Sequence, residues 1–116
     1  MTDQTTWLVH CEDEFEWLAD HDPAKLLNLI TSGTLTDPDL TFAAEYAGLI
    51  GESAIPYLVP LLDHPKAYVR EGAIIGLQAT RRIGQHPEVL TKLRQLAGTD
   101  PSEALREVAL EALDYL

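Results

Sequence analysis

Two stretches in the second half of this chain repeat each other, and the match includes turn residues as well as apolar ones. A proline, an apolar-Arg-Glu triplet, an alanine and a leucine recur at a constant offset of 36 residues. The matched positions are Pro65, Val69, Arg70, Glu71, Ala73 and Leu77 with Pro101, Leu105, Arg106, Glu107, Ala109 and Leu113. Upstream, at an offset of 35, the matched positions are Ile55, Leu58, Leu61 and Leu62 with Leu90, Leu93, Leu96 and Ala97. A period of this length predicts an array of similar units.

A weaker copy precedes these two units. Its apolar positions Leu26, Leu29, Ile30, Pro38, Phe42 and Ile50 align with Leu58, Leu61, Leu62, Pro65, Val69 and Leu77. A single unit cannot bury its own apolar face, so about three stacked units are the minimum for a stable array. The 116 residues suffice for three units and an N-terminal segment, which predicts a single domain.

The apolar spacing within the units is helical. In the last segment, one stripe with i, i+3, i+4 spacing contains Leu105, Val108, Ala109, Ala112, Leu113 and Leu116. Phe15, Leu18 and Ala19 indicate a further helix near the N-terminus, whereas Thr5 to Val9 fits either an extended segment or the first helical turns. No Asn-Gly or Asp-Gly pair joins two alternating runs, so an all-α fold is predicted.

Prolines, glycines and capping residues predict where these helices begin and end. Asp22 and Asp37, each followed by proline, are expected to cap two helices that end near Gly33 and Gly51. The other expected boundaries are a helix over 53–63 kinked at Pro60, one over 66–83 followed by Gly84, and one ended by Gly98. The glycines expected to allow close packing of helices are Gly48, Gly51, Gly72 and Gly76.

The stretch AIPYLVPLLDHPKAYVREGAIIGL (54–77) closely resembles a HEAT repeat of the short bacterial, PBS-lyase type, and 88–113 resembles a second copy. The resemblance implies a short α-solenoid of about three helix pairs: a single domain over 1–116, with an N-terminal cap (1–21), a degenerate unit (22–52) and two further units (53–84 and 85–116). It also implies that an arginine in the second helix of a unit ties the preceding turn together, although the degenerate unit has Ala43 at the aligned position. The implied pairs are Arg70 with Asp63 and Arg106 with Asp100.

Charge excludes several classes of partner. The chain has 19 acidic and 8 basic side chains, for a net charge of −11. Nucleic acids and anionic membranes are bound by lysine and arginine, so neither is an expected partner. Residues 1–52 hold 11 of the acids and a single cation, Lys25, and seven of those acids precede residue 23. One cysteine, Cys11, and no apolar run of spanning length predict a protein of the reducing cytoplasm.

The histidines and the cysteine of this chain are not spaced as a catalytic site or a metal site requires. His64 and His86 each precede a proline in an expected turn, and no second ligand pair stands at zinc spacing from His10, Cys11 or His21. Neighbouring residues of a helix point about 100° apart, which disfavours His10 as a base for the Cys11 thiol. We therefore expect no enzyme activity, no metal and no cofactor.

A protein-binding module is the function that remains. Carboxylates speed the capture of a basic partner and aromatic side chains anchor it. The expected binding residues are Glu12, Asp13, Glu16, Trp17, Asp20, Glu45 and Tyr46. The sharpest interpretation is an immunity or antitoxin-like inhibitor, a monomer or weak self-associator, that covers the cationic active site of a nuclease-type toxin. The alternatives are an adaptor or chaperone-like scaffold, a phycobilin-lyase-like accessory protein, and an acidic cap that serves only solubility, with docking around Tyr68, Gln78 and Arg81.

Overall fold

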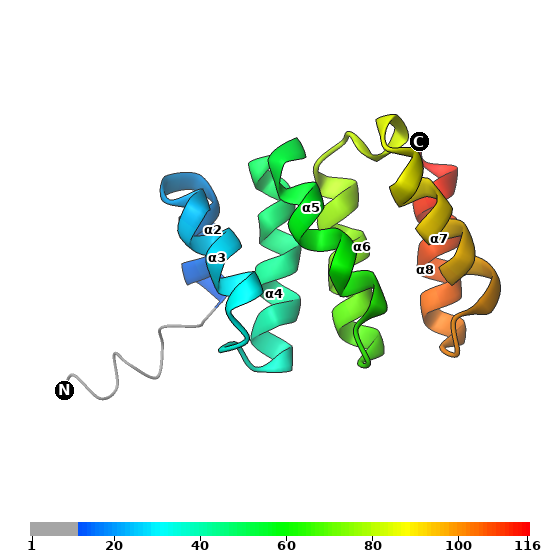
Figure 1. Ribbon diagram of the computed structural model, residues 1–116, viewed down its shortest axis with the longest axis horizontal. Coiled ribbons are helices and arrows are strands. Elements are labelled where there is room, and N and C mark those ends of the chain that lie inside the picture. The colour runs from blue at the N-terminus through cyan, green and yellow to red at the C-terminus, as the bar shows by residue number, and fades with distance from the viewer. Residues whose placement is uncertain (1–11) are drawn as a thin grey trace.

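The computed structural model describes residues 12–116, which form short helices joined by tight turns and contain no strand (Figure 1). The all-α prediction is confirmed over these residues, and the expectations for Thr5 to Val9, His10 and Cys11 lie outside them. In chain order the elements are α2 (Glu12–His21), α3 (Pro23–Ser32), α4 (Asp37–Ala47), η1 (Gly48–Ile50), η2 (Glu52–Ala54), α5 (Ile55–Leu58), η3 (Val59–Asp63), α6 (Ala67–Ala79), η4 (Ile83–Gln85), α7 (Pro87–Thr99) and α8 (Glu103–Asp114).

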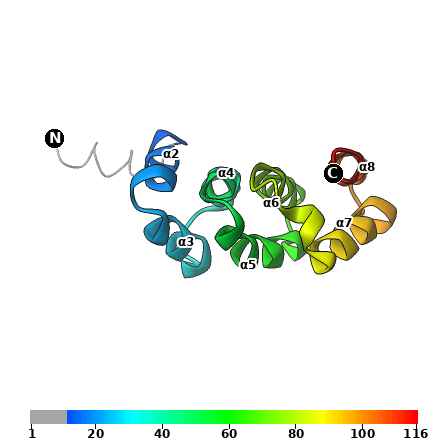
Figure 2. The same cartoon turned by 90° about the horizontal axis from the view of Figure 1, so that it is seen from above.

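The helices stand in two rows, as an α-solenoid requires (Figure 2). We call α2, α4, α6 and α8 the inner row, because Figure 2 shows them on the inside of a shallow arc, and α3, α5–η3 and α7 the outer row. Neighbours in the inner row pack on one another, and each outer helix pairs with the inner helix that follows it. Alternation along the chain makes the inner helices run in one direction, so their C-terminal ends lie along one edge (Figure 1).

The core lies between the rows and is built from the apolar stripes that the sequence predicts. Both matched second helices bury most of the predicted side chains, including Val69, Ala73 and Leu77 in α6 and Leu105 and Ala109 in α8. The prediction for Leu116 was wrong, because α8 ends at Asp114 and the Leu116 side chain beyond it is exposed. The largest fully buried side chains are Phe15, Leu26, Leu58, Leu62, Val69, Ile74, Leu77, Val89 and Leu93.

The cap of α3 is as predicted, whereas that of α4 is one residue off. The Asp22 carboxylate accepts a hydrogen bond from the Lys25 backbone N–H at 3.4 Å. In α4 the cap is Thr36, whose Oγ1 accepts from the Asp39 N–H at 3.3 Å, and Asp37 is the first helical residue. The expectation for Asp37 was wrong because the neighbouring threonine can also cap a helix, and the extended backbone of Thr36 places the cap there.

Two predicted helix ends are also wrong. Helix α6 stops at Ala79 rather than Ile83, because Thr80 donates through Oγ1 to the Leu77 carbonyl at 2.6 Å and the next residue adopts a positive φ of 59°. Gly98 lies inside α7, which ends at Thr99 because the proline after Asp100 holds that residue in an extended conformation. The bend at Pro60 is present, where α5 passes into the tighter η3 helix.

Three glycines allow α4 and α6 to approach closely, as predicted. A Cβ on Gly76 would lie 2.2 Å from the Ala44 carbonyl oxygen, and one on Gly72 would lie 2.8 Å from the Thr41 carbonyl oxygen. A Cβ on Gly48 would meet the Gly76 carbonyl oxygen at 2.0 Å. The prediction for Gly51 was wrong, because this residue has open space around it and serves a turn with a φ of 109°.

We expect Gly76→Ala to lower the free energy of unfolding by about 3 kcal/mol, the upper part of the usual range for overpacking, because a backbone oxygen cannot move aside as a side chain can. Gly98→Ala is the matched control. A Cβ there meets nothing within 4 Å, so alanine should raise stability by about 0.5–1 kcal/mol through its helix propensity. Urea unfolding followed by circular dichroism measures both changes, and equal effects of the two substitutions would contradict the close contact.

Candidate functional site

Three of the acidic residues predicted to bind a partner line a hollow beside α2. This hollow, which we call the acidic hollow, has a volume of about 520 Å³ and is lined by Asp13, Glu16, Trp17, Ala19, Asp20, His21 and Leu49. The three carboxylates are exposed, and the exposed fractions of Trp17 and Leu49 are 55% and 60%. The Trp17 ring stacks on the ring of His21 with centroids 4.5 Å apart, and the His21 Nδ1–H donates to the Trp17 carbonyl at 3.1 Å. The acidic hollow therefore combines carboxylates with an ordered, half-exposed indole.

Three other predicted residues do not line this hollow. Glu45 and Tyr46 lie on α4, where both are half-buried. Glu12 is the first residue of α2, and its side chain is outside the described part of the chain. Phe15 is fully buried, so the two aromatic residues of α2 have separate roles, one in the core and one at the surface.

The exposed apolar side chains lie on the inner row. The large hydrophobic residues exposed among residues 12–116 are Trp17, Phe42, Leu49, Tyr68, Ile75, Leu110, Tyr115 and Leu116. All of them belong to inner-row helices or to the residues directly after these helices, and none belongs to α3, α5, η3 or α7. Phe42, Leu49 and Ile75 were missed at the sequence level, and Phe42 was aligned with the buried Val69 although its exposed fraction is 37%.

A second hollow occupies the other end of the inner row, between the end of α6, η4 and the end of α8. It has a volume of about 630 Å³ and no acidic residue lines it. We call it the basic hollow; its lining includes Ile75, Gln78, Arg81, Arg82, Ile83, Tyr115 and Leu116. The two hollows of the inner row are therefore lined by opposite charges, although α8 itself carries four exposed carboxylates.

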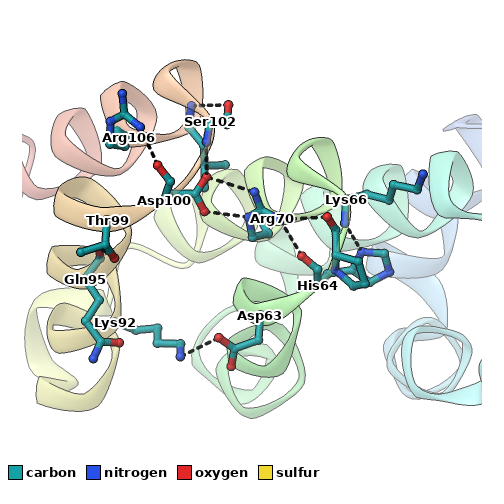
Figure 3. Close-up of polar contacts among 12 residues, drawn as sticks. Asp63, His64, Lys66, Arg70, Lys92, Gln95, Thr99, Asp100, Ser102 and Arg106 are labelled. Atoms are coloured by element: carbon teal, nitrogen blue, oxygen red, sulfur yellow. Dashed lines mark hydrogen bonds and ion pairs between the residues drawn. The ribbon is translucent and has the colours of Figure 1, made fainter.

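Arg70 joins the second unit to the third (Figure 3). Its Nη1 donates to the carbonyl oxygens of His64 at 2.7 Å and Pro65 at 3.1 Å. Its Nη2 and Nε lie 3.0 and 2.9 Å from the two oxygens of Asp100, which also accepts the Ser102 backbone N–H at 2.9 Å. The exposed fractions of the Arg70 and Asp100 side chains are 10% and 2%, so this is a buried two-pronged ion pair.

The implied pairing of Arg70 with Asp63 is wrong, because the Asp63 carboxylate faces the other way and pairs with the Lys92 ammonium at 2.6 Å (Figure 3). Arg106 does bond Asp100, through Nη1 to the backbone carbonyl at 2.6 Å. This contact is the repeat of the Arg70–His64 carbonyl contact 36 residues earlier. The arginines therefore bind their own turn as expected, and Arg70 also binds the turn of the next unit.

Comparison with known protein families agrees with this architecture. The sequence profile of HEAT repeats matches residues 24–114. This chain belongs to the HEAT-repeat family. No curated protein and no solved structure matches it significantly. HEAT repeats are characteristically protein-interaction modules without enzymatic activity, so the HEAT domain described here is a protein-interaction module.

A second polar contact between units of the HEAT domain involves His86. Its Nε2 lies 2.7 Å from the carboxylate of Glu52 in η2, at the boundary between the first and second units, and its Nδ1 lies 3.2 Å from that of Glu88. Both ring nitrogens can donate only when the imidazole is protonated, so the hydrogen bond to Glu52 is the largest effect and raises the pKa of His86. Desolvation lowers the pKa by less, and the hydrogen bond to Glu88 raises it further. His64 makes a similar, longer contact of 3.5 Å with Asp37 in the first unit.

We expect the contribution of His86 to stability to depend on pH. Because the folded state raises its pKa, the contribution is fully present below the ordinary histidine value of about 6.5 and is lost as pH rises through the higher folded value. His86→Gln should therefore lower the urea midpoint at about pH 6 and change it less at about pH 9. A difference from wild type that grows with pH would contradict the assigned ion pairs.

Residues 12–116 contain no group of three histidine, cysteine or acidic side chains placed to hold a metal ion. Within the same residues, no helix has both the length and the apolar character needed to cross a membrane.

Proposed function

We propose that this HEAT domain binds a basic protein through the acidic end of its inner row. The observation that carries the proposal is the gathering of exposed apolar side chains on the inner row, with the most acidic part of the chain beside them. A solubility feature alone would not need an exposed indole and an exposed leucine in the same hollow as three carboxylates. The proposed contact residues are Glu12, Asp13, Glu16, Trp17, Asp20, Glu45 and Tyr46, together with Leu49.

Two physical effects favour a basic partner, namely electrostatic attraction and anchoring by an aromatic side chain. Within residues 12–116, the exposed carboxylates of Asp13, Glu16 and Asp20 form no ion pair with a lysine or arginine, and residues 1–24 contain neither residue type. These carboxylates attract a cationic surface at long range and raise its rate of encounter. Trp17 then supplies the kind of large, partly apolar anchor that carries much of the free energy of binding at protein interfaces. Its stacking on His21 orders the ring before the partner arrives.

More specifically, we propose that the domain is an immunity-type inhibitor that binds a nuclease-type toxin. The active-site surface of a nuclease is cationic because it binds phosphates. A row of carboxylates around an apolar anchor can occupy such a surface in place of nucleic acid. An adaptor would bind elsewhere on its partner and leave nucleic-acid binding unchanged.

Site-specific photo-crosslinking in the native cell tests the proposal. A photoreactive residue at Leu49, beside the acidic hollow, should crosslink a basic protein. The same residue at Thr91, exposed on the outer-row helix α7, should not. Equal crosslinking from both positions would refute the inner-row site. With the captured protein purified, competition against a short DNA duplex separates an inhibitor, which displaces the duplex, from an adaptor, which leaves it bound.

A further inference from the structure

The basic hollow is unusual in a chain with this charge. Two adjacent arginines, Arg81 and Arg82, line it and are exposed. Neither forms an ion pair with any carboxylate of residues 12–116. Arg81 also holds the left-handed backbone position after α6, with a φ of 59°, where glycine is the usual residue. Two guanidinium groups are thus left unpaired in a protein with more than twice as many acids as bases.

The floor and rim of this hollow are apolar. Ile83 is buried beneath it, and Ile75, Tyr115 and Leu116 are exposed around it, with exposed fractions of 38%, 77% and 59%. A surface of this kind fits a ligand that brings carboxylates and large apolar side chains together. A free phosphate or carboxylate would leave the apolar part uncovered.

The acidic hollow of the same chain has those properties. It presents three exposed carboxylates, from Asp13, Glu16 and Asp20, around Trp17 and Leu49. The two hollows have similar volumes, about 520 and 630 Å³, and opposite charge. We propose that a second copy of this chain docks its acidic hollow on the basic hollow of the first.

The positions of the two hollows allow both contacts to form at once. His21 is the last residue of α2, and Leu49 lies just after α4, in η1. Arg81 and Tyr115 lie just after α6 and α8. The inner-row helices end along one edge of the domain (Figure 1), so the hollows stand at opposite ends of that edge. A two-fold axis through the middle of the edge places each acidic hollow against the partner's basic hollow. The arrangement is closed and gives a dimer rather than a chain of copies.

This inference does not rest on the proposed function, although it uses the same acidic hollow. A basic protein bound at α2 would compete with the second copy. Dimerisation is measured on the purified chain alone, so its failure would leave binding of a basic protein untouched.

Charge reversal at each hollow, followed by mixing, tests the dimer. One variant is Arg81→Glu with Arg82→Glu. The other is Glu16→Arg with Asp20→Arg, because both side chains line the acidic hollow and a cation at position 20, in the last turn of α2, suits the negative end of the helix dipole. Lys25→Glu with Arg94→Glu is the matched control for the first variant, since it changes the charge equally on exposed outer-row positions. Circular dichroism and the urea midpoint confirm that each variant is folded.

Sedimentation equilibrium should show a concentration-dependent dimer for the wild type and for the outer-row control. Each hollow variant alone should dimerise at least about tenfold more weakly, because like charges then face each other. Mixing the two variants should restore dimerisation, since both contacts of the mixed dimer again join opposite charges. The proposal is overturned by a wild type that stays monomeric up to about 1 mM, by variants that dimerise normally, or by mixing that restores nothing. Oligomers larger than a dimer overturn the closed arrangement.

Discussion

Replacing Arg70 by alanine should lower the free energy of unfolding by about 3–5 kcal/mol, the range for removing one partner of a buried ion pair. The substitution leaves the Asp100 carboxylate, whose exposed fraction is 2%, buried without its cationic partner. It also removes the donors to the His64 and Pro65 carbonyls. The loss falls at the junction of the second and third units, so it should weaken the whole array. Urea unfolding followed by circular dichroism measures it.

Two matched substitutions separate this role from a general effect of charge. Arg106→Ala should cost less, about 1–3 kcal/mol, because Arg106 is observed to bond only a carbonyl within residues 12–116. Asp63→Asn should cost at most about 1 kcal/mol, because its pair with Lys92 is exposed. Partner binding should survive in all folded variants. Loss of binding with unchanged stability in Arg70→Ala would reverse the assigned role.

The second large effect is expected on the rate of association with the basic partner. Converting Glu12, Asp13, Glu16 and Asp20 to their amides should slow association about tenfold or more at low salt, because electrostatic steering raises encounter rates by factors of about 10–1,000. The helical fold should persist or gain slightly in stability, since mutual repulsion of the carboxylates falls. Stopped-flow measurements should also show that added salt reduces the difference in association rate between the variant and the wild type. Salt screens exposed charges, and the Debye length at 0.1 M is about 10 Å.

Two further variants test whether the effect on association comes from the carboxylates of α2 and whether Trp17 anchors the partner. Amides at Glu103, Glu107, Glu111 and Asp114 change the net charge equally at the far end of the inner row, and should slow association much less. Trp17→Ala should lower affinity at nearly constant stability, because the indole is half-exposed and packs on His21 rather than in the core. If the variant with amides on α2 associates as fast as the wild type, the carboxylates of α2 serve solubility only. The docking surface then lies around Tyr68, Gln78 and Arg81.

Local features of the structure could be predicted from sequence because their causes are local. Apolar spacing within a helix reflects 3.6 residues per turn, so the buried stripe of α8 was readable from Leu105 and Ala109 alone. Helix ends were less certain where several residues compete for one role. Thr36 and Asp37 both suit a cap, and Thr80 ended α6 before Gly84 could.

The candidate site was only partly predictable, since exposure depends on what packs over each helix. Phe15 and Trp17 are two residues apart in an acidic helix, yet one is fully buried and the other is 55% exposed. The packing of α2 against α3 and α4 decides between them. Phe42 is a second example of exposure that the sequence did not predict. The core-facing side chains of α4 are the small ones of its alanines, whereas the Phe42 ring is exposed.

The sequence by itself determined the repeat, the helical class and the arginine in each repeated turn, because each depends on residues close together in the chain. Only the tertiary structure decided the carboxylate that Arg70 binds, the row that carries the exposed apolar side chains and the separation of the two charged hollows. The reason is physical: Arg70 and Asp100 are 30 residues apart, and they meet only because the stacking of successive units sets one turn against the next.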